Sequence, residues 1–186
     1  MGALERRRFT IADYHRMGEV GILGCNERLE LIDGELIVRE PIGSQHAATV
    51  IRLSRLWTLH LAERALVSAQ NPIVLPDVDS ELQPDITILA PRADFYSAAH
   101  PRPADVLLLI EVADTSLRLD RRVKLPLYAR AGIREAWLCD LTTERVEVHR
   151  EPTTQGYGAV RVFARGASLA AAAFPDIPLT VDDLLG

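Results

Sequence analysis

The chain has 186 residues, of which 48% are hydrophobic and 25% charged. This is ordinary globular usage, and it excludes a disordered chain and a coiled coil. At about 150 residues per domain, the length predicts a single domain, residues 1–186, that buries a core. The 26 acidic residues outnumber the 21 Lys and Arg, and the net charge of −5 argues against non-specific coating of nucleic acid.

Neither the cysteines nor the apolar segments indicate an extracellular or membrane protein. Cys25 and Cys139 lie in separate segments without a Cys-x-x-Cys or Cys/His cluster, so we expect no disulfide framework and no zinc module. The first residues lack the apolar stretch of a signal peptide, and no apolar run approaches the roughly 18 residues that span a bilayer. We therefore expect a cytoplasmic protein without a membrane segment.

The N-terminal part of the sequence predicts a short helix and a β-hairpin. Thr10 opens a Thr-x-x-acid pattern that is typical of a helix start. Farther on, Asp33-Gly34 separates two alternating runs, which is the strongest short-range hairpin signal. A two-residue turn places Glu30 opposite Ile37 and assigns it to the face away from the core. The residues expected on the core face are Leu29, Leu31, Leu36 and Val38.

The middle of the chain predicts one amphipathic helix followed by three strands. Apolar residues recur at intervals of three and four from 46 to 64, which indicates a helix packed against another element. The strands are expected at 67–75, 85–90 and 106–113. The last of them has almost no polar alternation, which is typical of a central strand buried on both faces.

The C-terminal third adds a helix, a strand and a hairpin. The expected segments are a helix at 121–131, a strand at 135–141, a hairpin from 145–150 and 159–164, and a helical turn at 181–185. This order predicts an α/β (α+β) fold, with a mixed central β-sheet flanked by helices on both faces and added hairpins.

Glu111 is the most informative residue for function because it interrupts the most hydrophobic strand. An unpaired carboxylate there would cost several kcal/mol or stay protonated, so it needs compensation, and the simplest partner is an arginine. A second carboxylate, Asp85, opens the strand at 85–90. If that strand pairs beside the Glu111 strand, the two carboxylates converge at one end of the sheet.

Lys124, on the next helix, completes a candidate metal-dependent site. Carboxylates hold Mg²⁺, which prefers oxygen ligands, lowers the pKa of water and neutralises charge on phosphate. A lysine beside them positions or deprotonates the water, or stabilises the pentavalent state. The simpler interpretation of Lys124 is a surface ion pair with Asp120, four residues earlier, and spacing alone does not decide between the two.

A set of short motifs extends from about Thr10 to Leu185. These are Glu-Leu-Ile-Asp-Gly-Glu-Leu at 30–36, Pro84-Asp85, Ile110-Glu111-Val112, Ser116, Asp120, Lys124, Tyr128, Ala131-Gly132, and Glu-Ala-Trp-Leu-Cys-Asp at 135–140. As a set they resemble the Uma family, restriction-endonuclease-like proteins within the PD-(D/E)XK nuclease superfamily.

The resemblance implies a restriction-endonuclease-like core and a metal site. Asp85 and Glu111 would bind Mg²⁺, or Mn²⁺ in its place, together with the backbone carbonyl of Val112. The superfamily lysine two residues after the glutamate is replaced by Ala113, and the resemblance implies that Lys124 takes its role from the following helix. An outer part of the site would contain Glu30, His46, Ser116 and Asp120. From the residues alone, Glu30 also fits a solvent-exposed face and His46 a polar helix start.

Two departures from the family pattern concern the path to Lys124. The family usually carries Ser-Pro-Ser where this chain has Asp114-Thr115-Ser116, and the added negative charge would supply an extra ligand or oppose substrate binding. In addition, Pro126 lies within the predicted helix, so the helix either begins near Val123 or kinks.

The sequence favours a Mg²⁺-dependent endonuclease that acts on DNA. Arg118, Arg121 and Arg122 are candidate phosphate contacts beside the site, whereas on charge alone they fit a solvated helix face. Two alternatives stay open: a catalytically inactive nuclease-like protein that binds nucleic acid or a partner protein, and a metal-dependent hydrolase of another phosphoester. We also expect a homodimer, because nucleases that cut both strands commonly pair their sites.

Overall fold

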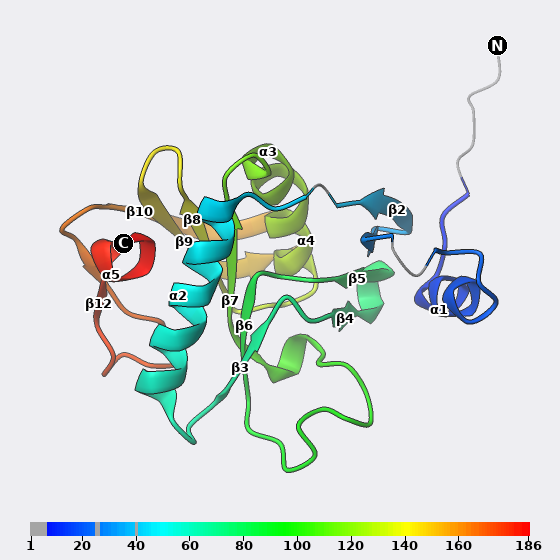
Figure 1. Cartoon of the computed structure of the whole chain (residues 1–186), viewed down its shortest axis with the longest axis horizontal. Helices are drawn as coiled ribbons and strands as arrows, with labels where there is room; N and C mark the ends of the chain where they lie inside the picture. Colours follow the sequence, from blue (N-terminus) through cyan, green and yellow to red (C-terminus); the bar gives the residue numbers. More distant parts are fainter. Residues whose placement is uncertain (1–6, 25–26, 40) are drawn as a thin grey trace.

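The computed structural model describes residues 7–24, 27–39 and 41–186, and its centre is a six-stranded mixed sheet in the order β10-β9-β8-β7-β6-β3 (Figure 1). The strands are β3 (Leu66–Ala69), β6 (Ile86–Leu89), β7 (Val106–Ala113), β8 (Glu135–Asp140), β9 (Arg145–Thr153) and β10 (Gly156–Ala164). β7 and β8 run parallel, and the other neighbours run antiparallel. The predicted mixed sheet is confirmed, with Cys139 buried on β8 and Cys25 outside the described residues.

Helices cover both faces of this sheet, as the sequence predicts. On one side lie α2 (Ser44–Leu61) and α5 (Val181–Leu185), and on the other α3 (Leu117–Leu119) and α4 (Leu125–Arg130). The first helix, α1 (Ile11–Glu19), lies apart from this sheet (Figure 1). Ile110 and Val112 of β7 belong to the apolar core that includes α2 and α5, whereas Leu109 and Ala113 belong to the core that includes α4. Glu111 lies on the α4 side of the strand, between Leu109 and Ala113. Among the described residues, no helix is both long and apolar enough to cross a membrane.

A second sheet of four strands, β2-β1-β5-β4, lies beside the first. Its strands are β1 (Leu29–Ile32), β2 (Glu35–Val38), β4 (Ile73–Leu75) and β5 (Ser80–Leu82), and a small pair is formed by β11 (Ser168–Leu169) and β12 (Leu179–Thr180). The predicted hairpin and its register are confirmed. Asp33 and Gly34 both have positive φ, 49° and 75°, as a type I′ turn requires.

The predicted core face of this hairpin is wrong. Glu30 is 1% exposed, whereas Val38, expected in the core, is 71% exposed. β1 lies inside its sheet between β2 and β5, and both Leu31 and its neighbour Ile32 are buried, so neither face of the strand is open to solvent. Glu30 tolerates this burial because basic side chains from other elements lie against it.

Two other predicted elements differ from the structure. The strand expected at 67–75 is broken at Gln70, whose φ is +53°, and its halves β3 and β4 belong to different sheets. The helix expected at 121–131 begins earlier, at α3, and passes through a π-helical turn, Asp120–Lys124, before α4. The Leu125 N–H donates to the carbonyl of Asp120, so the wide turn lies just before Pro126, which lacks an N–H and would crowd the carbonyl four residues back.

Candidate functional site

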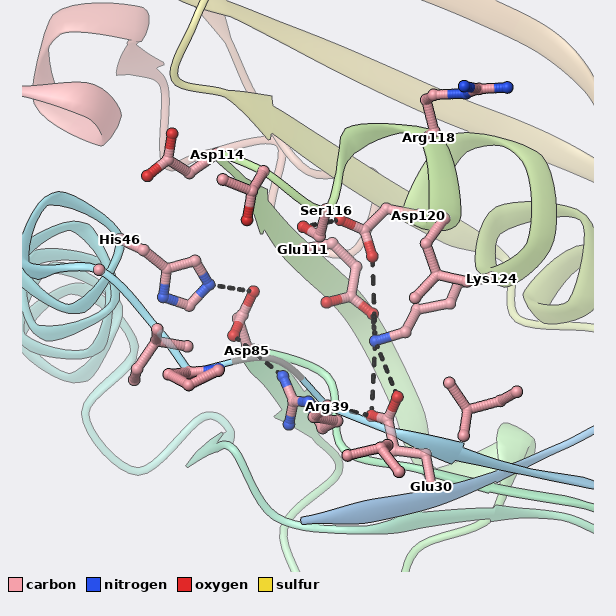
Figure 2. Close-up of a pocket in the computed structure, with 17 residues that line it drawn as sticks. Glu30, Arg39, His46, Asp85, Glu111, Asp114, Ser116, Arg118, Asp120 and Lys124 are labelled. Carbon is pink, nitrogen blue, oxygen red and sulfur yellow. Dashed lines mark hydrogen bonds and ion pairs between the residues drawn. The ribbon is translucent and has the colours of Figure 1, made fainter.

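A cavity of about 480 Å³ opens where β6 begins and β7 ends, between the four-stranded sheet and the start of α2 (Figure 2). The antiparallel pairing of Ile86 with Ile110 brings Asp85 and Glu111 to the same end of the sheet, as the sequence predicts. The buried carboxyl groups that line the cavity are Glu30, Asp85, Glu111 and Asp120.

Asp85 is held by hydrogen bonds from three directions. Its Oδ2 atom accepts from the Val112 N–H at 2.9 Å and contacts His46 Nε2 at 3.0 Å, and its Oδ1 atom accepts from Gln70 at 3.3 Å. Burial raises the pKa of Asp85, but the contacts with His46, Val112 and Gln70 outweigh it, and the pKa is lowered. Asp85 is therefore an ionised carboxylate inside the protein.

Val112 also bears on the metal-ligand prediction. In an extended strand, the N–H and the carbonyl of one residue point to the same side. Because the Val112 N–H donates to Asp85 and the Ala113 carbonyl accepts from Leu141 on the β8 side, the Val112 carbonyl points toward the Asp85 side. The pairing of β6 with β7 stops at the Ile86–Ile110 pair. The Val112 carbonyl therefore lies beyond the part of β7 that pairs with β6.

Glu111 is buried, but few hydrogen-bond donors lie near its carboxyl group among the described residues. Its Oε1 atom accepts from the Tyr128 hydroxyl at 2.5 Å and lies 3.4 Å from Lys124 Nζ. Burial raises the pKa of Glu111 to about 8, with Lys124 opposing the shift and nearby carboxylates adding to it. The simplest expectation, an arginine partner for this glutamate, is wrong, because its partners are a lysine and a tyrosine.

Lys124 is the central cation of the cavity. It is 3% exposed, and its Nζ lies 3.3 Å from Glu30, 3.4 Å from Glu111 and 3.9 Å from Asp120. The surface ion pair considered from the sequence is therefore a buried cluster. Burial lowers the pKa of Lys124, but the three carboxylates outweigh it and raise the pKa above 10.5. Lys124 stays protonated near neutral pH, which suits charge stabilisation and not proton abstraction.

Glu30 and Arg39 form the side of the cavity nearest the four-stranded sheet. Glu30 Oε1 accepts from the Gln83 N–H at 2.8 Å, and Arg39 lies 3.7 Å from Glu30 and 3.9 Å from Asp85. Sequence reasoning missed Arg39. The signal was available, because Ile37 pairs with Glu30 across the hairpin and Arg39 follows two residues later on the same face.

The remaining predicted residues separate into two groups. Ser116 donates to Asp120 at 2.5 Å, and His46 in the first turn of α2 contacts Asp85, so both lie at the cavity. Arg118 lines the cavity mouth, but Figure 2 shows its guanidinium directed away from the carboxylates. Arg121 is bound to Glu147 at 2.5 Å. Arg122 is exposed and does not line the cavity, so the expected basic cluster is not assembled at the site.

The cavity carries more buried acid than fixed positive charge. The carboxyl groups of Glu30, Asp85, Glu111 and Asp120 face two residues that are permanently cationic, Lys124 and Arg39. Among the described residues, no group of three or more His, Cys, Asp or Glu is arranged to hold a metal ion. The donors are nevertheless carboxylate oxygens with a backbone carbonyl beside them, which is the set that Mg²⁺ and Mn²⁺ prefer. Among the described residues, the buried Glu30 Oε2 atom has an ion pair with Lys124 at 3.3 Å but accepts no hydrogen bond.

Comparison with known proteins agrees with this architecture. A family model described as "Uma2: Putative restriction endonuclease" matches residues 11–182. The chain belongs to the Uma2 family. The predicted resemblance is thereby confirmed, and the match spans the cavity, both sheets and nearly all of the helices. No curated protein is significantly similar to the chain.

Solved structures share the fold of this Uma2 protein. One of them is described as "a putative nuclease belonging to DUF820" from Anabaena variabilis ATCC 29413 and is 16% identical to this chain. The superposition has a TM-score of 0.73 and covers 95% of this chain and 97% of the other. The likeness establishes the shared mixed α/β architecture, with the central sheet and its flanking helices.

Proposed function

We propose that this Uma2 protein is a metal-dependent endonuclease that hydrolyses phosphodiester bonds in DNA. The observation that carries the proposal is that buried carboxyl groups outnumber fixed cations in an open cavity at one end of the central sheet. A divalent cation would take the place of the proton on Glu111 and balance the carboxylate charge that its loss leaves. Family membership supports the same reaction class.

In this proposal, Asp85, Glu111 and the Val112 carbonyl hold Mg²⁺, and Mn²⁺ replaces it. When bound, Mg²⁺ supplies Lewis-acid activation of water and neutralises charge on the phosphoryl group. Asp85 is already ionised, because His46 and Val112 hold its Oδ2 atom. Glu111 must give up its proton to serve as a ligand, since burial keeps it largely protonated near neutral pH.

Lys124 acts as a fixed positive charge. Its protonated amine stabilises the charge that develops on the phosphoryl oxygens, and its three carboxylate contacts hold it in place for that role. The Tyr128 hydroxyl orients Glu111, and Ser116 orients Asp120. We further propose that the protein is cytoplasmic and pairs as a homodimer to cut both strands of a duplex.

The test combines metal titration with a cleavage assay. We expect calorimetry to show Mg²⁺ and Mn²⁺ binding to the parent and its loss in Asp85→Asn. We expect plasmid DNA to be nicked or linearised only by proteins that bind the metal. Glu63→Gln, at an exposed position on the loop after α2, is the matched acid-to-amide control and keeps both properties.

The outcomes separate the proposal from its rivals. Metal binding without cleavage of any DNA, but with hydrolysis of small phosphodiesters, would replace DNA by another phosphoester. DNA or partner binding that persists in Asp85→Asn, with no cleavage in any divalent metal, would identify a catalytically inactive nuclease-like protein. Equal cleavage by Asp85→Asn and the parent would exclude the assigned site.

A further inference from the structure

We propose that Arg39 binds a phosphate oxygen of the substrate after a divalent cation has entered the cavity, and that it neutralises Glu30 and Asp85 in the metal-free protein. The inference rests on the proposed nuclease function and adds a substrate-binding residue to it.

The backbone fixes Arg39 at the cavity. The Arg39 N–H donates to the carbonyl of Arg28 at 2.7 Å, which continues the pairing of the β1–β2 hairpin beyond β2. The side chain is 12% exposed and lines the cavity. Figure 2 shows the guanidinium between the carboxylates of Asp85 and Glu30. Arg39 is thus a largely buried cation inside the cavity, not one on the protein surface.

The contacts of Arg39 are long for a guanidinium that faces carboxylates. Within the described part of the chain, its side chain has acceptors at 3.5 Å on Gln83, 3.7 Å on Glu30 and 3.9 Å on Asp85. By comparison, Arg64 contacts both oxygens of Asp176 at 2.6 and 2.9 Å, which is the usual range for charge-assisted bonds. The two carboxylates attract Arg39, but at these distances its N–H groups form no short hydrogen bonds with them. Those N–H groups are suited to donate two parallel hydrogen bonds to a phosphate.

The other cations near the cavity are held by more carboxylates than Arg39, are bound more closely, or point away from the site. Lys124 is held by three carboxylates, Arg121 is bound to Glu147, and Arg118 points away from the site (Figure 2). A divalent cation among the carboxylates weakens the attraction that holds Arg39, because it neutralises the same oxygens. The arriving phosphodiester then offers Arg39 a new anionic partner at the same place.

The experiment compares Arg39→Ala and Arg39→Lys with the parent. Arg64→Ala is the matched control, because Arg64 lies beyond the far end of the 18-residue helix α2, about 27 Å from the helix start at the cavity. Mg²⁺ affinity is measured by calorimetry without DNA. Binding of a short DNA duplex is then measured in Ca²⁺, another oxygen-preferring cation, over a range of salt concentrations.

We expect Arg39→Ala to bind Mg²⁺ at least as tightly as the parent, since a nearby positive charge has been removed. Duplex affinity should fall about 10- to 100-fold, and the slope of log K against log salt should become shallower by about 0.9, the value for one lost phosphate contact. Arg39→Lys should keep the slope and bind more weakly, because an ammonium is a point charge. Arg64→Ala should match the parent.

Three results would overturn the inference. Unchanged duplex affinity in Arg39→Ala would show that Arg39 does not contact the substrate. Mg²⁺ and duplex affinities that fall together, with an unchanged salt slope, would show that Arg39 only positions the carboxylates. A parent that binds neither Mg²⁺ nor duplex would instead remove the proposed nuclease function itself, and the Arg39 inference with it.

Discussion

Two buried glutamates on neighbouring parallel strands, Glu111 on β7 and Glu135 on β8, show what separates a structural carboxylate from a functional one. Both are almost completely buried, at 1% and 2% exposure. Glu135 Oε1 accepts from the Trp137 indole at 2.7 Å and from Arg150 at 2.8 Å, and its Oε2 accepts from the Ala172 N–H at 2.7 Å. Glu135 therefore has close donors on both oxygens.

Among the residues that the structure describes, Glu111 has one close donor, the Tyr128 hydroxyl, and a shared lysine at 3.4 Å. Its other neighbours include the carboxyl groups of Asp85, Glu30 and Asp120, which raise its pKa further. Burial alone does not distinguish the two glutamates. Nor does a cavity, because each glutamate lines one. The difference lies in their partners: close donors complete the shell of Glu135, whereas further carboxyl groups surround Glu111.

The largest expected difference between the two glutamates is in catalysis. Glu111→Gln should reduce Mg²⁺-dependent DNA cleavage to background, because it removes a proposed metal ligand at the open site. Glu135→Gln should cleave at the parental rate wherever the protein remains folded, since its carboxylate serves the core. Initial rates on plasmid DNA, with circular dichroism as the check on folding, measure this directly. Similar losses in both variants would show that Glu111 and Glu135 do not differ in their role in cleavage.

The next difference is in the pH dependence of stability. The pKa of Glu111 is about 8 in the folded protein and near 4.5 when unperturbed. Between those values the native state binds the extra proton, so the free energy of unfolding falls as pH rises, by up to about 1.4 kcal/mol per pH unit from this group. In urea denaturation with EDTA, Glu111→Gln should lose that part of the slope and Glu135→Gln should keep it. A parental slope in Glu111→Gln would show that Glu111 is ionised throughout.

A smaller effect is expected on the stability of the well-satisfied glutamate. Glu135→Gln replaces a charged acceptor that joins Trp137, Arg150 and the backbone of Ala172 by a neutral amide. We expect the free energy of unfolding to fall by about 2–3 kcal/mol, because bonds to charged groups are weakened and one oxygen acceptor becomes a donor. Urea denaturation at neutral pH tests this. A neutral result would mean that the desolvation of this carboxylate already offsets its contacts.

Much of the fold follows from local patterns in the sequence. Alternation around Asp33-Gly34 gives the hairpin and its register, and the apolar run at 106–113 gives the central strand with its observed ends. The convergence of Asp85 and Glu111 needs only one further step, the pairing of β6 with β7. These features are predictable because periodicity and turn chemistry act over a few residues.

The features that sequence reasoning missed depend on distant partners. Glu30 is buried because Lys124, 94 residues away, lies against it, and no local pattern reports that contact. The break at Gln70 was hidden within an otherwise β-like run. Arg121 was expected in a basic cluster at the site, but it is bound to Glu147 on β9. Placing such residues requires knowing which strands lie side by side.

The smallest expected effect tests the single close donor of Glu111. Tyr128→Phe removes the hydroxyl that donates to Glu111 Oε1 at 2.5 Å without changing the ring, and it should destabilise the protein by about 1–2 kcal/mol. The loss should grow from pH 5 to pH 9, because an ionised acceptor depends on the donor more than a protonated one does. Tyr157→Phe is the matched control, since its hydroxyl donates to the backbone carbonyl of Ile133 at 2.9 Å, and its cost should not vary with pH. Urea denaturation of both variants across that pH range measures the loss in the free energy of unfolding. If the loss in Tyr128→Phe does not change with pH, the hydroxyl supports packing alone and does not stabilise the ionised form of Glu111.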